Sequence, residues 1–163
     1  MEEIQMIFVL YGDVCTIPAI LERIKAAGKK AMVHIDLIAG LSAKEISVEF
    51  IARQTRADGI ITTKPALVRR AKELGIFAVL RFFVIDSLAL KNIENLEMQC
   101  GTSRPDFIEV LPGVMPKVLG RIAKVSRIPM IAGGLITEKE DVIAALSAGA
   151  IAVSSTNQDV WNL

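Results

Sequence analysis

The sequence predicts an α/β protein of the TIM-type (β/α) barrel class, in which parallel strands alternate with covering helices. Seven short apolar segments alternate with six amphipathic segments along the 163 residues. Hydrophobic residues make up 52% of the chain, but aromatic residues only 5%. An aliphatic core of this kind is typical of parallel strands buried on both faces. The alternation favours a barrel over the alternative, a doubly wound open sheet.

The expected strands are short segments rich in Ile, Val, Leu and Ala, each bounded by turn residues. They are Ile4–Tyr11, Ala31–Ile38, Gly59–Thr63, Phe77–Val84, Phe107–Leu111, Pro129–Ala132 and Ala150–Ser154. Seven strands are one fewer than a complete TIM barrel contains.

The expected helices lie between these strands and carry apolar residues at helical spacing. They are Ile17–Ala27, Ala43–Thr55, Pro65–Leu74, Asp86–Glu97, Pro116–Val125 and Glu138–Ser147. Thr137 and Glu140 have the spacing of a capping box at the start of the last helix. Glycines that favour a helix C-terminus follow three of these segments, at Gly28, Gly75 and Gly149.

The composition excludes several classes of protein. The chain carries 19 basic and 18 acidic residues, and a net charge of +1 provides no overall positive field for nucleic acid. Cys15, Cys100 and a single histidine do not form a metal-ligand pattern, so no metal is expected. The run Ile7–Tyr11 is too short for a signal sequence or a membrane span. We expect one soluble, cytoplasmic barrel domain over residues 1–163.

The segment Ile131–Thr156 carries the strongest functional signal. Two successive strands end in small residues there, and the loops after the last two strands of a TIM barrel bind phosphate. Glycine lets the backbone approach an anion, and a helix N-terminus favours negative charge. Alternatively, the glycines only form a turn and the hydroxyls cap the final helix. The residues predicted to bind phosphate are Gly133, Gly134, Ser154, Ser155 and Thr156.

Polar residues at the ends of earlier strands are further candidates. His34 and Asp36 are two residues apart on an expected strand, so both side chains would face the same side. The alternative is a buried polar pair satisfied within the protein. Lys64 follows Thr62 and Thr63 at another strand end and is in reach of a ligand, although a solvated lysine is the commoner case.

Arg81 and Glu109 each interrupt an otherwise apolar strand. A buried arginine requires an anionic partner, which is either a ligand or a protein carboxylate such as Glu109. A structural ion pair and a direct ligand contact both remain open. No nucleophile–base arrangement stands out, so no catalytic residue is predicted and the chain resembles a binder of a small phosphorylated molecule.

These residues lie in segments that together resemble the glycerol-3-phosphate-responsive antiterminators of bacterial glycerol uptake operons. The matching segments follow in order from about Ala27 to the end of the chain: Met32–Leu41, Asp58–Thr63, Arg81–Ser87, Pro105–Gly113, Ile131–Ile136 and Ala150–Asn157, with Trp161 nearby. The resemblance implies a TIM-type barrel that binds glycerol 3-phosphate as its effector, with no other cofactor. It also implies that the liganded protein binds leader mRNA and prevents premature termination.

The resemblance further assigns roles to residues. Gly133, Gly134, Ser155 and Thr156 would hold the phosphate. The glycerol end would be lined or supported by His34, Asp36, Lys64, Arg81 and Glu109.

Family members usually carry one more strand and helix before the equivalent of Ile4–Tyr11. The first unit is absent from this sequence, or the barrel has seven strands, or a partner chain completes it. An exposed strand edge promotes association, so we expect it to be covered, with a homodimer as one solution.

RNA binding has little independent support in the sequence. Basic residues cluster on and beside two expected helices: Arg53, Arg56, Lys64, Arg69, Arg70 and Lys72. Ordinary solvated helix faces are the favoured explanation of this cluster. Aromatic residues that stack on bases are scarce, since Tyr11 and Trp161 are the only Tyr and Trp. Two alternatives to the regulator therefore stay open: a sugar-phosphate enzyme on the same barrel, and a metabolite-binding module without RNA.

Overall fold

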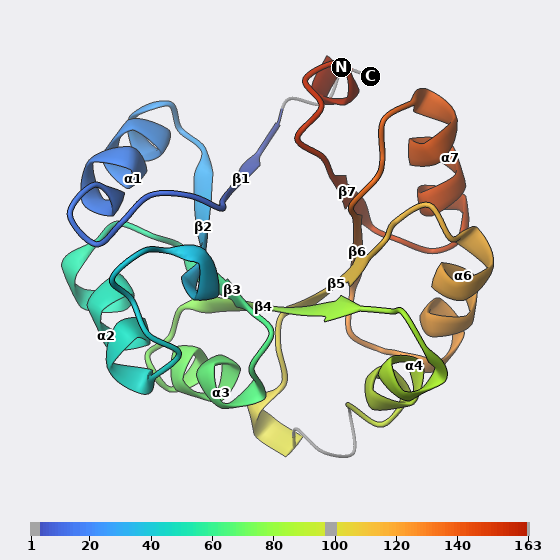
Figure 1. Cartoon of the computed structure of the whole chain (residues 1–163), viewed down its shortest axis with the longest axis horizontal. Coiled ribbons are helices and arrows are strands. Elements are labelled where there is room, and N and C mark those ends of the chain that lie inside the picture. Colours follow the sequence, from blue (N-terminus) through green and yellow to red (C-terminus); the bar gives the residue numbers. More distant parts are fainter. Residues whose placement is uncertain (1–3, 97–100, 163) are drawn as a thin grey trace. The chain divides into compact units, whose positions relative to one another are not determined.

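The computed structural model describes residues 4–96 and 101–162. The chain divides into two compact units, an N-terminal unit (Ile4–Leu80) and a C-terminal unit (from Arg81 onward). In each unit, parallel strands alternate with helices along the chain (Figure 1). The described ranges contain seven strands, as the sequence predicts. The single barrel domain over residues 1–163 stays a prediction.

The strands of the N-terminal unit pair in the order of the chain. They are β1 (Met6–Val9), β2 (Lys30–His34), β3 (Gly59–Thr62) and the first part of β4 (Phe77–Phe83). The pairs β1–β2, β2–β3 and β3–β4 are all parallel. A doubly wound sheet reverses its strand order at a switch point, so its first four strands do not all pair in the order of the chain. The unbroken pairing of β1 to β4 in chain order therefore excludes that alternative.

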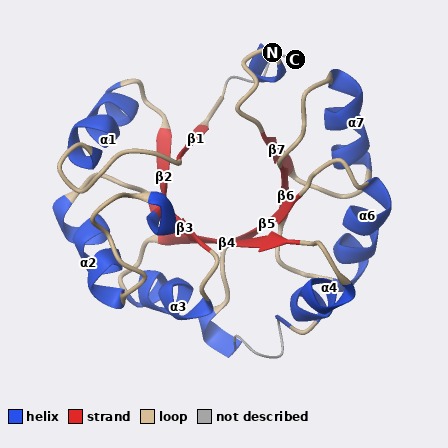
Figure 2. Ribbon diagram, in the orientation of Figure 1, coloured by secondary structure: helices blue, strands red, loops and turns tan. Residues whose placement is uncertain are grey.

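The helices of the N-terminal unit cover one face of these strands (Figure 2). They are α1 (Ile17–Ala26), α2 (Glu45–Gln54) and α3 (Pro65–Glu73). Each buries aliphatic side chains of the kind the periodicity predicts, including Leu21, Ile51 and Leu67. Gly28 and Gly75 have φ angles of 72° and 74°, which confirms the predicted glycine C-caps.

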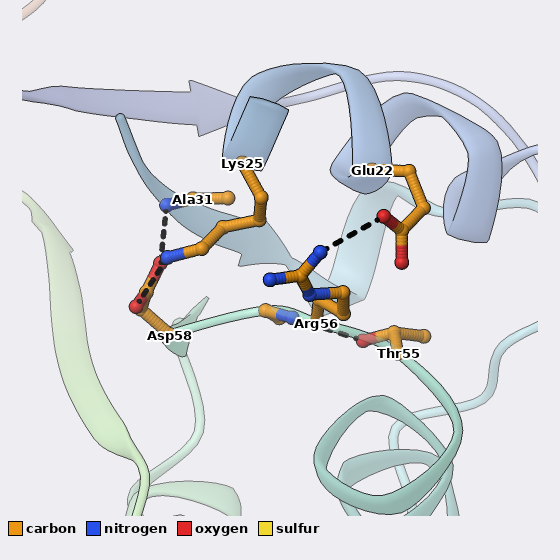
Figure 3. A network of polar contacts seen from close by, with 7 residues as sticks. Glu22, Lys25, Ala31, Thr55, Arg56 and Asp58 are labelled. Carbon is orange, nitrogen blue, oxygen red and sulfur yellow. Dashed lines mark hydrogen bonds and ion pairs between the residues drawn. The ribbon is translucent and has the colours of Figure 1, made fainter. Parts of the chain in front are cut away.

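Asp58 ties α1 to the starts of β2 and β3. Its carboxylate accepts hydrogen bonds from Lys25 Nζ at 2.9 and 2.8 Å and from the Ala31 N–H at 2.8 Å (Figure 3). Burial raises the pKa of Asp58, but these donors and the Lys25 charge lower the pKa further, to below its usual 3.8. The nearby Arg56–Glu22 ion pair, at 3.1 Å, is exposed and contributes little to stability.

The C-terminal unit repeats this construction. It contains the end of β4, then β5 (Phe107–Leu111), β6 (Met130–Gly133) and β7 (Ala152–Ser154). The pairs β5–β6 and β6–β7 are parallel. Its helices are α4 (Ser87–Glu94), α6 (Pro116–Val125) and α7 (Lys139–Ser147), with short 3₁₀ turns at Gly101–Ser103 and Val160–Asn162.

Two local predictions are wrong in detail. Strand β2 ends at His34, and a 3₁₀ turn follows at Ile35–Leu37, so Asp36 does not share a strand face with His34. The capping box of α7 joins Glu138 to Asp141, one residue later than the predicted pair. Asp141 completes it because its carboxylate reaches the N–H groups of both Thr137 and Glu138, at 3.0 and 3.2 Å.

Neither a membrane span nor a metal site is found in the described ranges. No helix among residues 4–96 and 101–162 has the length and apolar character to cross a bilayer. The same residues contain no group of three His, Cys, Asp or Glu side chains placed to hold a metal ion. Cys15 is an exposed free thiol, and Cys100 lies outside the described residues.

Candidate functional site

The ends of β6 and β7 lie side by side in the C-terminal unit. Gly133 is in register with Ser154, so the loops that leave these two residues start next to each other. The loop after β6 turns immediately, with Gly134 at a φ of 78° and its carbonyl accepting a hydrogen bond of 3.0 Å from the Gly113 N–H. The predicted phosphate residues are thus brought together at one strand end.

Leu135 has a backbone conformation that the sequence does not predict. Its φ of 62° makes it the one non-glycine residue with a positive φ among residues 4–96 and 101–162. The conformation is unfavourable for an L-residue with a Cβ atom, and such residues concentrate at functional sites. The side chain of Leu135 is 71% exposed. Strain is therefore held in the turn that was predicted to approach a phosphate.

Some backbone N–H groups at the ends of β6 and β7 have no acceptor within the described ranges. Within the described ranges, the N–H groups of Gly134, Leu135 and Thr156 donate no hydrogen bond to another residue. Thr156 is exposed, and Gly134 and Leu135 follow one another in the left-handed region. Neighbouring backbone N–H groups in a turn provide donors that favour an anion.

Ser155 holds the two loops together through its hydroxyl. The Oγ atom donates to the Ile136 carbonyl at 2.8 Å and accepts from the Asn157 N–H at 3.1 Å. Asn157 Nδ2 adds a bond of 3.0 Å to the Thr137 carbonyl, and Trp161 Nε1 one of 2.7 Å to the Ser155 carbonyl. The Ser155 hydroxyl is therefore occupied within the protein, which favours a role in shaping the loops.

A buried ion pair lies beside the same strand ends. Arg81 Nε donates to Glu109 Oε2 at 2.6 Å, and the two side chains are 9% and 1% exposed. The other carboxylate oxygen, Oε1, accepts from Ser154 Oγ at 2.7 Å. The structural ion pair suggested by the sequence is thus present, and Ser154 is its third member.

Gly133 makes room for this cluster. A Cβ atom at Gly133 would lie 2.4 Å from Ser154 Oγ and 2.7 Å from Glu109 Oε1. Both distances are too short for non-bonded atoms, so a larger residue would displace one of the two side chains. Gly133 is therefore required for packing, and Gly134 for its backbone conformation.

The N-terminal unit contains the other predicted cluster. Asp36 accepts hydrogen bonds from the Thr62 hydroxyl at 3.1 and 3.0 Å and from the Thr63 N–H at 2.9 Å. Lys64 Nζ lies 3.5 Å from Asp36 Oδ1 and is half exposed. His34 is buried, with 3% of its surface exposed. The protein itself therefore satisfies much of the polar capacity of Asp36.

Asp36 is an anion at neutral pH. Burial raises the pKa of Asp36, but the hydrogen bonds from Thr63 and Thr62 and the nearby Lys64 and His34 lower the pKa further, to below its usual 3.8. The carboxylate therefore fixes the loop after β3 and holds the Lys64 ammonium close by.

Part of the basic cluster on and beside α2 and α3 is paired with acidic neighbours. Arg70 pairs with Glu49 and, at 2.7 Å, with Glu73. Arg56 pairs with Glu22 in the same unit. These contacts favour the interpretation of solvated helix faces over that of an RNA-binding patch.

The ten predicted site residues thus fall into two groups. The C-terminal unit brings together Arg81, Glu109, Gly133, Gly134, Ser154, Ser155 and Thr156, and the N-terminal unit holds His34, Asp36 and Lys64. Sequence reasoning placed Thr62 and Asn157 at strand ends without assigning them a role, and it did not select Leu135. Thr62 ends β3 and Asn157 follows β7, and a polar residue at a strand end is a usable signal, whereas nothing in the sequence marks the positive φ of Leu135.

Comparison with known proteins adds independent information. A sequence profile described as "Glycerol-3-phosphate responsive antiterminator" matches residues 1–161. A curated relative, the uncharacterized protein YgcP of Escherichia coli strain K12, is 47% identical over 161 residues, which cover 99% of this chain and 83% of the relative.

Solved structures agree with this match. The glycerol uptake operon antiterminator regulatory protein of Listeria monocytogenes is 33% identical with a TM-score of 0.91, covering 99% of this chain and 85% of that one. A glycerol uptake operon antiterminator-related protein of Thermotoga maritima is 36% identical with a TM-score of 0.85, covering 98% and 88%.

A more distant likeness concerns the fold alone. Orotidine 5′-phosphate decarboxylase of Pyrococcus horikoshii is 20% identical with a TM-score of 0.69, and it covers 98% of this chain and 80% of that one. The chain has an α/β fold of the TIM type, as the alternation of its segments predicts. The match over residues 1–161 shows that the chain belongs to the family of glycerol-3-phosphate responsive antiterminators.

Proposed function

We propose that this protein binds glycerol 3-phosphate as its effector and that the liganded protein binds the leader mRNA of a glycerol operon. Binding would prevent premature termination of transcription, so the protein acts in the cytoplasm as a regulator and not as an enzyme. It needs no cofactor besides the effector. Membership of the antiterminator family supports the regulatory role, and the chemistry of the C-terminal unit supports the effector.

One observation carries the proposal: the N–H groups of Gly134, Leu135 and Thr156 are left without acceptors in the described ranges, at the adjoining ends of β6 and β7. A phosphate group presents several oxygen acceptors and a negative charge, which such backbone donors bind well. The hydroxyl of Ser155 fixes the relative position of the two loops. The donors are therefore in place before the ligand arrives, which lowers the entropic cost of binding.

The RNA half of the proposal does not depend on a general positive field. The net charge is +1, and several residues of the basic cluster are already paired with carboxylates. Few counterions are displaced when few free cations contact phosphates. We therefore expect specific RNA retention with a shallow dependence on salt.

A mobility-shift assay with leader RNA tests both halves together. Wild-type protein should retard the RNA more strongly when glycerol 3-phosphate is present. Thr156→Asp should abolish the ligand's effect, because a carboxylate at this exposed strand end repels phosphate without removing a hydrogen bond of the loops. Thr156→Asn, which has nearly the same size and no charge, is the matched control and should respond like the wild type.

Other outcomes point to other functions. If calorimetry shows ligand binding but the RNA is never retarded, the protein is a metabolite-binding module and the antitermination proposal fails. If glycerol 3-phosphate is consumed in a reaction that Asp36→Asn or Glu109→Gln abolishes, the protein is an enzyme. If glycerol 3-phosphate neither binds nor changes the RNA shift, it is not the effector and that part of the proposal fails.

A second copy of this chain is an additional proposed partner. In the described residues, β1 pairs with β2 alone, and a groove of about 380 Å³ runs along it, lined by apolar residues that include Ile7, Val9 and Ile24. A strand that is paired on one side only promotes association. Sedimentation of the purified protein over a range of concentrations should show a dimer, and a monomer throughout would contradict this part of the proposal.

A further inference from the structure

We propose that Glu109 is a positioning residue that sets the specificity of the site for the alcohol end of the ligand. It would act through Arg81 and Ser154, so Ser154 would serve the alcohol end and not the phosphate. This inference rests on the proposed binding of glycerol 3-phosphate and assigns the part of the same site that reads its carbon chain.

Glu109 is more deeply buried than its two hydrogen-bond partners. Glu109 is 1% exposed, and each of its oxygens holds one donor, Arg81 Nε at 2.6 Å and Ser154 Oγ at 2.7 Å. Arg81 is slightly more exposed, at 9%, and Ser154 is only half buried. The carboxylate therefore lies behind two side chains that are better placed to reach a ligand.

The two partners offer complementary hydrogen-bonding groups. A serine hydroxyl has one proton, and that of Ser154 is directed to Glu109, so its oxygen remains an acceptor. The Arg81 guanidinium carries five N–H donors, and the bond to Glu109 uses the one on Nε. An acceptor and a donor held side by side match an alcohol group, which both donates and accepts. The chemical class recognised is thus a phosphorylated polyol.

The same geometry argues against Ser154 as a phosphate ligand. Its proton is committed to a carboxylate, so it cannot be donated to a phosphate oxygen at the same time. A phosphate placed against this hydroxyl would also approach the negative charge of Glu109, and like charges in a buried site repel strongly. The phosphate is better served by the N–H groups of Gly134, Leu135 and Thr156, which donate to no other residue in the described ranges.

Gly133 places the two halves of the site next to each other. It packs against both Ser154 Oγ and Glu109 Oε1, and Gly134, which begins the anion-binding turn, follows it directly. A ligand anchored by its phosphate at that turn would extend its first carbons beside the Glu109 cluster. This juxtaposition predicts that the cluster distinguishes ligands that differ only in the arrangement of their hydroxyls.

Titration calorimetry with three probes tests this prediction: sn-glycerol 3-phosphate, its enantiomer sn-glycerol 1-phosphate, and inorganic phosphate. Wild-type protein should prefer the 3-phosphate to the 1-phosphate. Ser154→Ala should reduce that preference about tenfold, the effect of one hydrogen bond in a buried site, and should change the Kd for inorganic phosphate less than about twofold. Glu109→Gln should reduce the preference at least as much.

Ser155→Ala is the matched comparison, because it removes the neighbouring hydroxyl that bonds only to loop backbone. This substitution should weaken the binding of both enantiomers equally and leave the ratio of their Kd values unchanged. A purely structural role of Ser154 would produce the same result as Ser155→Ala. If Glu109→Gln does not fold, Ser154→Ala decides the question.

The outcomes separate the inference from the function on which it rests. If wild-type protein binds none of the three probes, the proposed function fails and the inference fails with it. If it binds them but does not discriminate the enantiomers, or if Ser154→Ala discriminates as well as wild type, only the inference is overturned. Loss of inorganic phosphate binding in Ser154→Ala would show that Ser154 contacts the phosphate, which would also overturn the inference.

Discussion

Ser154 donates a hydrogen bond of 2.7 Å to Glu109, and the absence of a side chain at Gly133 makes this contact possible. A methyl group at Gly133 would lie 2.4 Å from the Ser154 oxygen. The Glu109 carboxylate also holds Arg81, so Gly133 on β6 preserves an ion pair that ties β5 to β4. Glycine at this position is therefore explained by close packing and not by backbone conformation.

Gly133→Ala should lower the free energy of unfolding by about 1–3 kcal/mol, because the added methyl group overpacks the cluster. The substitution should also weaken the binding of glycerol 3-phosphate. Urea unfolding and calorimetry measure the two effects. Gly120→Ala in α6 is a control, since its Cβ would meet only the Ala148 carbonyl at 3.8 Å. That variant should be more stable by about 0.5–1 kcal/mol; equal effects of the two substitutions would contradict the packing argument.

Breaking the Arg81–Glu109 pair from one side should be costly. Glu109→Leu leaves a buried guanidinium without its carboxylate and should destabilise the protein by about 3–5 kcal/mol. Combining it with Arg81→Met removes both charges and should recover most of that stability, while ligand affinity stays low. Thermal unfolding of the single and double variants measures this. A double variant that binds glycerol 3-phosphate normally would show that the pair has no part in the site.

The strain at Leu135 should be removable. Leu135→Asn suits a φ of 62° better than leucine and loses little burial, because the leucine is 71% exposed. We expect the variant to be more stable by about 1 kcal/mol. Leu135→Val, which is β-branched, should instead be less stable than wild type. Denaturant midpoints compare the three proteins, and the reverse order would mean that the side chain stabilises the turn.

The acid dependence of stability should depend on Asp58. Its pKa is lowered in the folded protein, so the carboxylate stabilises the fold above the usual pKa of 3.8, and this contribution is lost as pH falls through the lower folded value. Asp58→Asn should be less stable by about 1–3 kcal/mol at neutral pH, with a difference from wild type that shrinks below about pH 4. Urea unfolding across this range measures the difference.

Glu22→Gln is the control for that series. Glu22 takes part in the neighbouring ion pair with Arg56, but both side chains are more than half exposed. Water screens such a pair, so the substitution should change stability by less than about 0.5 kcal/mol. A large effect of Glu22→Gln, or a constant difference for Asp58→Asn down to strongly acid pH, would contradict the assignment of the acid limb to Asp58.

The sequence predicts the fold well because its signals are local. Alternating apolar runs, helix-period stretches and the glycines Gly28 and Gly75 depend only on neighbouring residues, and the structure confirms them. Helix and strand ends are less certain, because they depend on which polar group reaches the backbone. Asp141 illustrates this, since it binds the N–H groups of both Thr137 and Glu138 and so shifts the predicted cap by one residue.

The site is predicted less completely because its contacts join residues far apart in the chain. The sequence suggests the Arg81–Glu109 pair, since a buried charge needs a partner, but it does not reveal that Ser154 binds the same carboxylate. Asp36 was expected on a strand, whereas β2 ends at His34 and the carboxylate turns toward Thr62. Strand length and tertiary hydrogen bonds decide such details.

The most direct test of the central claim follows the backbone amides during a titration with glycerol 3-phosphate. In ¹⁵N-labelled protein, the resonances of Gly134, Leu135 and Thr156 should shift together and saturate, because their N–H groups receive the phosphate oxygens. Gly28 and Gly75, which end helices in the N-terminal unit, should show no comparable shift. Saturable changes confined to residues elsewhere, or no change at millimolar ligand, would contradict the claim that the ends of β6 and β7 form the effector site.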